Sequence, residues 1–171
     1  MIVEIRNRQR RRAVDLKLLK RITLELLSDH LELTEVELGI LLVSAREMAR
    51  VNQQYLQHEG STDVITFDHS LVPVVVPTLP TVIHGELYIC VEDAEVQAVE
   101  FGTSWQEEMV RYVIHGILHL CGYDDLKPAP RREMKRAEAR WLRTMAKAHD
   151  LSQVGGSPKR KVKVRGRNSR P

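Results

Sequence analysis

A predicted helix that ends in two histidines and a glycine constrains this chain more than any other stretch. Apolar side chains recur at three- and four-residue intervals over residues 105–118, which predicts an amphipathic helix beginning near residue 103 or 104. His115 and His119 are rotated by about 40° and separated by about 6 Å of rise, so both imidazoles can reach one ion. Gly122 follows where helices often end in a left-handed residue, so the chain can turn back over the helix end.

This turn would bring a carboxylate towards the two histidines. Both Asp124 and Asp125 follow Gly122 closely enough to reach them. Two imidazoles and one carboxylate, with a fourth position open to water, form the ligand set of a catalytic zinc ion. Core packing is the alternative interpretation of two histidines on an apolar helix. The pattern favours a metal site and leaves the choice of aspartate open.

The residue after the first histidine limits the chemistry of such a site. The spacing His-x-x-x-His-x-x-Gly-x-x-Asp is similar to that of metal-binding helices in zinc proteases. Those proteases carry a general-base Glu directly after the first histidine. This chain has Gly116 there, which has no side chain to accept a proton. The metal site therefore remains a good prediction, whereas peptide cleavage is disfavoured.

Three motifs, taken in order, resemble one known family. Residues 115–124 read His-Gly-Ile-Leu-His-Leu-Cys-Gly-Tyr-Asp. They resemble the His-Gly-x-Leu-His-Leu-x-Gly-Tyr-Asp-His signature of the YbeY family, bacterial zinc-dependent endoribonucleases that act in ribosomal RNA maturation. Residues 52–67 are similar to the family's Asn-x-x-Tyr-Arg-x-x-x-x-x-Thr-Asp-Val-Leu-Ser-Phe segment, and residues 85–89 to its Gly-Asp-Ile-x-Ile strand. The matching regions cover roughly residues 40–140.

The resemblance implies a function and a ligand set. The activity would be that of a single-strand-specific, metal-dependent endoribonuclease in ribosomal RNA maturation (small-subunit rRNA 3′ end) and ribosome quality control. One Zn²⁺ ion per chain would be held by His115, His119 and Asp125, because Asp125 stands at the last motif position; Asp124 remains the alternative. Ribosomal RNA and ribosomal particles are the expected partners, and the cytoplasm is the expected location.

Two positions depart from the family pattern. Asp125 stands where the family usually has His, and Leu56 stands where an Arg usually follows the Tyr. An Arg there would bind phosphate or stabilise charge that develops during the reaction. Both changes reduce positive charge near the substrate. Two alternatives therefore stay open, namely a weakly catalytic or non-catalytic RNA- or ribosome-binding protein with a structural zinc, and a zinc hydrolase of another substrate.

Composition predicts one folded domain followed by a basic tail. With 171 residues, 43% of them hydrophobic, the chain suffices for one domain, predicted over residues 1–150. Residues 151–171 carry seven Lys and Arg and no acid, and we expect a disordered basic arm there. The chain has no run of 18 apolar residues and no signal-peptide pattern at its start, so we expect no membrane segment.

The remaining patterns predict an α+β fold, with a small mixed four-stranded sheet packed with about five helices and the zinc site on a central helix. The Pro-rich residues 68–81 are predicted to form an extended loop or edge strand. The charged face of a helix over residues 131–148 is interpreted as mostly solvated. Cys90 and Cys121 are interpreted as buried apolar residues without chemistry. Strands are expected over the ranges 1–5, 36–43, 62–67 and 84–91.

Overall fold

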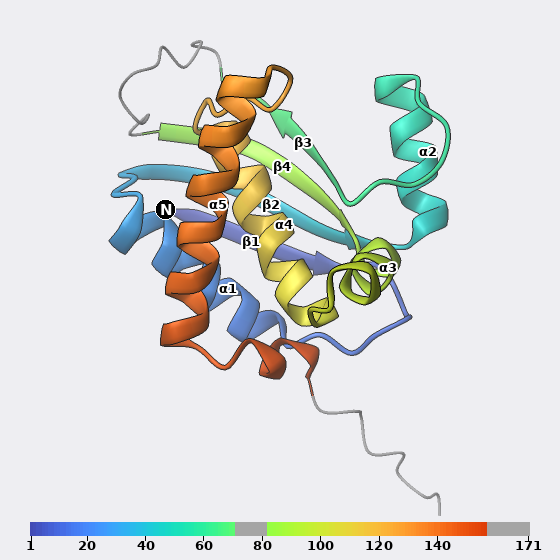
Figure 1. The fold of residues 1–171 in the computed structure, drawn as a ribbon, viewed down its shortest axis with the longest axis horizontal. Coiled ribbons are helices and arrows are strands. Elements are labelled where there is room, and N and C mark those ends of the chain that lie inside the picture. The colour runs from blue at the N-terminus through green and yellow to red at the C-terminus, as the bar shows by residue number, and fades with distance from the viewer. Residues whose placement is uncertain (71–81, 157–171) are drawn as a thin grey trace, which may run out of the picture.

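Four strands form one mixed sheet in the order β1-β2-β4-β3 in this computed structural model, which describes residues 1–70 and 82–156 (Figure 1). β1 (Ile2–Asn7), β2 (Glu35–Val43) and β4 (Val82–Cys90) run parallel, and β3 (Val64–Asp68) pairs antiparallel with β4 at the sheet edge. β2 lies in the sheet centre, as its apolar run predicts.

Five α-helices accompany the sheet in the described ranges, and the predicted α+β class is confirmed. The first of them continues into a π-helical turn over Leu26–His30, and a short 3-10 helix, η2, follows the last. The helices are α1 (Leu16–Glu25), α2 (Ala45–Leu56), α3 (Val91–Phe101), α4 (Trp105–Leu120) and α5 (Pro128–Ala148).

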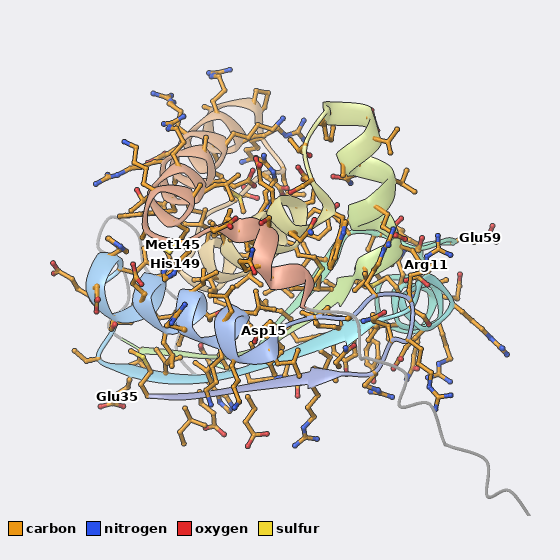
Figure 2. All side chains as sticks on the ribbon, turned by 90° about the horizontal axis from the view of Figure 1, so that it is seen from below. Arg11, Asp15, Glu35, Glu59, Met145 and His149 are labelled. Carbon is orange, nitrogen blue, oxygen red and sulfur yellow. The ribbon has the colours of Figure 1, made fainter. Side chains whose placement is uncertain are left out.

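The two faces of the sheet are covered differently. Alternate strand residues such as Leu38, Ile40 and Leu87 are buried in the main core, together with apolar side chains of α1, α4 and α5. On the opposite face, α2 packs over one end through a smaller cluster that includes Met48 and Ile65. Figure 2 shows α1 above the sheet, and strand side chains that project from the lower face without a helix over them. The fold thus places α4 on the buried face, between α3 and α5 (Figure 1).

Two reciprocal glycine–leucine contacts bring α4 close to β4. A Cβ atom on Gly116 of α4 would lie 2.5 Å from the Leu87 Cδ2 atom of β4. A Cβ atom on Gly85 of β4 would lie 2.6 Å from the Leu120 Cδ2 atom of α4, and 2.6 Å from the backbone oxygen of Phe67. Real Cβ atoms do not approach other atoms this closely. The backbone oxygen of Phe67 cannot move aside, so Gly85 is required at this helix–sheet distance, whereas a larger residue at position 116 would require the Leu87 side chain to shift.

The packed chain continues past residue 150, where the sequence analysis placed the end of the domain. η2 (Leu151–Gly155) buries Leu151 and Val154, and the Asp15 backbone N–H donates to the Val154 carbonyl at 2.9 Å. The rest of the predicted basic tail, and most of the predicted Pro-rich loop, lie outside the described residues. None of the described helices has the length and apolarity that a membrane span needs.

Candidate metal centre

α4 begins and ends as its sequence predicts. The Ser104 side chain caps its N-terminus by accepting from the Glu107 backbone N–H at 3.2 Å. At the other end, Gly122 adopts a φ of 87°, and the Tyr123 N–H donates to the Leu118 carbonyl at 3.0 Å. This left-handed turn sends the chain back across the end of α4, which carries the following aspartates towards the histidines.

Three donor atoms converge at this turn. The Nε2 atoms of His115 and His119 lie 3.1 Å apart, and the Asp125 Oδ2 atom lies 4.0 and 3.9 Å from them. Zinc–ligand bonds of about 2.1 Å in a tetrahedral arrangement separate neighbouring donors by about 3.4 Å. In the described part of the chain, only these three residues form a group able to hold a metal ion. The structure brings together the three residues that the sequence predicts as ligands, His115, His119 and Asp125.

Hydrogen bonds to the other ring nitrogens orient both imidazoles. The Nδ1 atom of His115 lies 2.9 Å from the Glu138 Oε2 atom, and the Nδ1 atom of His119 lies 3.1 Å from the Tyr123 carbonyl oxygen. Because both partners are acceptors, both Nδ1 atoms carry hydrogen, and the two Nε2 lone pairs face each other. Two lone pairs at that distance repel unless a proton or metal ion lies between them. The arrangement therefore fits a divalent cation.

The surrounding charges shift the pKa values of the two histidines in opposite directions. Burial acts to lower the pKa of His115, but the hydrogen bond and negative charge of Glu138 outweigh it, so this pKa is raised. Burial and the neighbouring His115 lower the pKa of His119. Burial acts to raise the pKa of Glu138, yet its hydrogen bonds with His115 and Arg111 lower it overall. Glu138 is therefore held as a carboxylate beside the metal ligand.

A pocket of about 460 Å³ adjoins the donor atoms. Its lining includes three aspartates and no Lys or Arg among the described residues. Leu56 and Leu126 also line it, with 46% and 82% of their surfaces exposed. The metal ion would therefore supply the positive charge on this surface. The lining residues are Leu56, Val64, Ile65, Thr66, Asp68, His115, His119, Leu120, Asp124, Asp125 and Leu126.

Comparison with known proteins gives the family. The sequence model described as "Endoribonuclease YbeY" matches residues 4–146. The chain belongs to the YbeY endoribonuclease family. It is 32% identical to the Endoribonuclease YbeY of Chlorobium phaeovibrioides over 145 residues, which cover 85% of this chain and 91% of that protein. It is 38% identical over 106 residues to the Endoribonuclease YbeY of Bacteroides fragilis, covering 62% of this chain and 70% of that protein.

A solved structure resembles the fold of this YbeY-family chain over most of its length. The solution structure of TM1509 from Thermotoga maritima superposes with a TM-score of 0.63 at 28% identity. The superposition covers 92% of this chain and 98% of that one.

Asp125, rather than Asp124, faces the histidines of this YbeY-family chain. The Oδ1 atom of Asp124 accepts from the Leu126 backbone N–H at 3.0 Å, so that carboxylate closes the local turn. Asp125 directs Oδ2 towards both Nε2 atoms, while the Arg131 Nε atom donates to its backbone oxygen at 2.7 Å. The geometry favours Asp125 as the third ligand, as the family position suggests.

Substitution of the two aspartates should separate their roles. We expect Asp125→Ala to weaken zinc binding by about 10–100-fold or more, because removal of a residue that only hydrogen-bonds to a ligand already has an effect of that size. Asp124→Ala should change the zinc affinity much less. Competition with a chromophoric chelator measures both affinities. A larger loss with Asp124→Ala would reverse the assignment.

Other residues singled out in the sequence take supporting positions. Asn52 is buried and its side-chain amide donates to the Gly60 carbonyl at 3.0 Å, which holds the loop after α2. Tyr55 packs edge-on against Phe67, with ring centroids 5.1 Å apart. Cys121 is buried, which raises the pKa of its thiol to about 12, and it is not part of the donor group. None of the three lines the pocket beside the donor atoms.

Glu138 is the site residue that the sequence analysis missed. The charges of residues 131–148 were interpreted as mostly solvated, but the Glu138 side chain is only 13% exposed and contacts His115. The contact joins α5 to α4 across 23 residues of sequence. The one available signal was an acid on the apolar side of α5, one residue after Ala137 and four after Met134.

Proposed function

We propose that this YbeY-family chain is a zinc-dependent endoribonuclease that cleaves single-stranded RNA. The observation that carries the proposal is the convergence of the Nε2 atoms of His115 and His119 with a carboxylate oxygen of Asp125 beside an open pocket. Two imidazoles and one carboxylate, with room for a further ligand, form a donor set typical of catalytic zinc. The YbeY family supports an endoribonuclease, and the donor set supports the metal.

The residues of the site have separate roles in this proposal. When bound, zinc supplies Lewis acidity to the phosphodiester group and to water. Glu138 and the Tyr123 carbonyl keep the Nδ1 protons in place and the Nε2 lone pairs free. Residues of β3 and the end of α2 line the pocket that adjoins the donors, and we expect RNA to approach through this pocket.

Ribosomal RNA is the substrate that we propose, with the 3′ end of small-subunit RNA as the cleaved region and ribosome quality control as a second role, both in the cytoplasm. The family name supports RNA cleavage, and the resemblance in the three motifs points to ribosomal RNA. The seven Lys and Arg over residues 157–171 would attract RNA phosphates in a salt-dependent, sequence-independent manner.

A direct cleavage assay tests the proposal. The purified protein should cut a fluorescent single-stranded RNA when loaded with zinc, leave the corresponding duplex intact, and lose activity after treatment with a chelator. Readdition of zinc should restore cleavage. Stoichiometric zinc without cleavage of any RNA would refute the catalytic proposal.

A non-catalytic RNA- or ribosome-binding protein with a structural zinc is the second candidate. The observation that favours it is the absence of Lys and Arg among the described residues lining the pocket, with Leu56 at the position of the usual Arg. Such a protein would retain ribosomal RNA on a filter at low salt without cutting it. Cleavage by the wild type that His119→Ala abolishes would exclude this candidate.

Restoring a cation to the pocket should increase cleavage. Leu56 lines the pocket and is half exposed, so an Arg side chain can extend there without entering the core. A hydrogen bond to a charged group contributes about 1.5–3 kcal/mol, so Leu56→Arg should raise kcat/KM by about tenfold or more. Leu56→Met is the matched control, with a long side chain and no charge. Equal kcat/KM values for both variants would show that phosphate is not bound at this side of the pocket.

A further inference from the structure

A series of hydrogen-bonded charged side chains, Glu138, Arg111 and Glu108, leads from the candidate metal ligand His115 to the first turn of α4. We propose that Arg111 and Glu108 are positioning residues that act on the metal site through Glu138. The proposal deepens the proposed metal site and rests on it, but it does not require that the protein cut RNA.

Glu138 uses one carboxylate oxygen for each neighbour. Its Oε2 atom lies 2.9 Å from His115 Nδ1, and its Oε1 atom accepts from Arg111 Nη1 at 3.1 Å. The hydrogen bond from Arg111 to one oxygen therefore restricts rotation of the carboxylate. The other oxygen is held facing the imidazole of His115. An acceptor held in this way keeps the His115 proton on Nδ1 and turns Nε2 towards the metal position.

Arg111 is itself held from the opposite side. Its Nε atom donates to Glu108 Oε2 at 3.1 Å, and its Nη2 atom lies 3.7 Å from Glu107 Oε1. Arg111 precedes His115 by four residues on α4, so the guanidinium and the imidazole lie on one side of the helix. The guanidinium thus links two carboxylates that would otherwise approach each other without a counter-charge.

Glu108 is the buried end of this series of charged side chains. Its exposure is 0%, and among the described residues no other Asp or Glu is buried. Its Oε1 atom accepts from Thr103 Oγ1 at 2.6 Å, and it lies in the first turn of α4, where the helix dipole favours negative charge. A buried carboxylate is retained only with such partners. Each oxygen of both carboxylates is therefore engaged, and the arrangement has little rotational freedom.

A cavity beside these charged side chains determines which substitutions of Arg111 are informative. It has a volume of about 610 Å³, and its lining includes Arg111, Glu138 and the exposed residue Lys135. A small residue at position 111 would let water enter and hydrogen-bond to Glu138 in place of the guanidinium. Methionine fills a similar volume without donating a hydrogen bond, so Arg111→Met removes the contact with less change in packing.

The experiment measures zinc affinity and the ring proton of His115 in the full-length chain. We expect Arg111→Met to raise the zinc dissociation constant by about tenfold to a hundredfold, the usual effect of losing a partner of a metal ligand. In zinc-loaded wild type the His115 Nδ1 proton should give a slowly exchanging NMR resonance, and in Arg111→Met it should exchange rapidly. Arg111→Lys keeps the positive charge but places its donors on a single nitrogen atom, so it should lie between the two.

Arg136→Met is the matched control, because Arg136 is exposed on α5 and donates only to the Arg132 backbone in the described structure. It should leave both readouts unchanged. If Arg111→Met does not fold, Arg111→Lys carries the test. A folded Arg111 variant with lowered thermal stability but wild-type zinc affinity and proton exchange would overturn the proposal. Since no RNA is used, this result is independent of whether the protein cleaves RNA.

Discussion

His119→Ala should leave the chain folded but without its metal ion. His119 supplies one of three converging donor atoms. Without it, only His115 and the more exposed Asp125 remain, and we expect two ligands to be too few to hold zinc. Even an outer hydrogen-bonding partner of a ligand changes metal affinity about 10–100-fold, so loss of a ligand should do more. After dialysis, bound zinc should fall far below stoichiometry, and cleavage of single-stranded RNA should be undetectable in the same sample.

His84→Ala is the control for this experiment. His84 lies on the open face of the sheet, where its ring packs against His69 at a centroid distance of 5.4 Å. Zinc content and cleavage should both match the wild type. If His119→Ala keeps stoichiometric zinc, the α4 histidines are core residues and the metal centre lies elsewhere. If it loses zinc but still cuts RNA, the metal is structural.

Gly85→Ala should lower the free energy of unfolding by about 3 kcal/mol, at the upper end of the usual range for overpacking. The new methyl group would lie 2.6 Å from the backbone oxygen of Phe67, which cannot move without disturbing the pairing of β3 and β4. It would also press on Leu120 of α4. For a domain of this size the melting temperature should fall by about 6–12 °C, measurable by circular dichroism.

Gly39→Ala is the matched substitution on the other face of the sheet. The three atoms nearest to a Cβ atom there all belong to the Glu86 side chain, with the Cγ atom nearest at 3.2 Å, and this flexible side chain can move aside. Its effect should stay within about 0.5 kcal/mol, as for an ordinary surface change. Equal stability of the two variants would mean that α4 and β3 adjust freely, and that the distance between helix and sheet is not set by Gly85.

Local signals explain why α4 and the proximity of His115, His119 and Asp125 could be predicted from the sequence. The Ser104 cap, the apolar periodicity and the left-handed Gly122 are all encoded within neighbouring residues, and each is confirmed. The choice between Asp124 and Asp125 depended on the direction of one turn, which the residues alone left open. The fold class followed in the same way from strand and helix patterns along the chain.

Contacts between distant segments could not be predicted. Glu138 reaches His115 only because α5 packs alongside α4, and nothing in a single sequence gives the rotation of one helix against another. Gly116 illustrates the same limit. Its lack of a side chain disfavours peptide cleavage, and that can be read from the sequence. Its close approach to the Leu87 side chain cannot, because Leu87 lies on a strand almost 30 residues earlier.

The order in which the chain is synthesised gives the arrangement of this site a further consequence. All four strands lie before residue 91, whereas the ligands and Glu138 are confined to residues 115–138. A growing chain has therefore synthesised all four strands before its first candidate metal ligand, although the domain folds as a unit. Pairing of the strands therefore cannot depend on a metal ion until these later residues have been made. In the proposed zinc protein, the metal ion can bind only after α4 and the turn that follows it have been made.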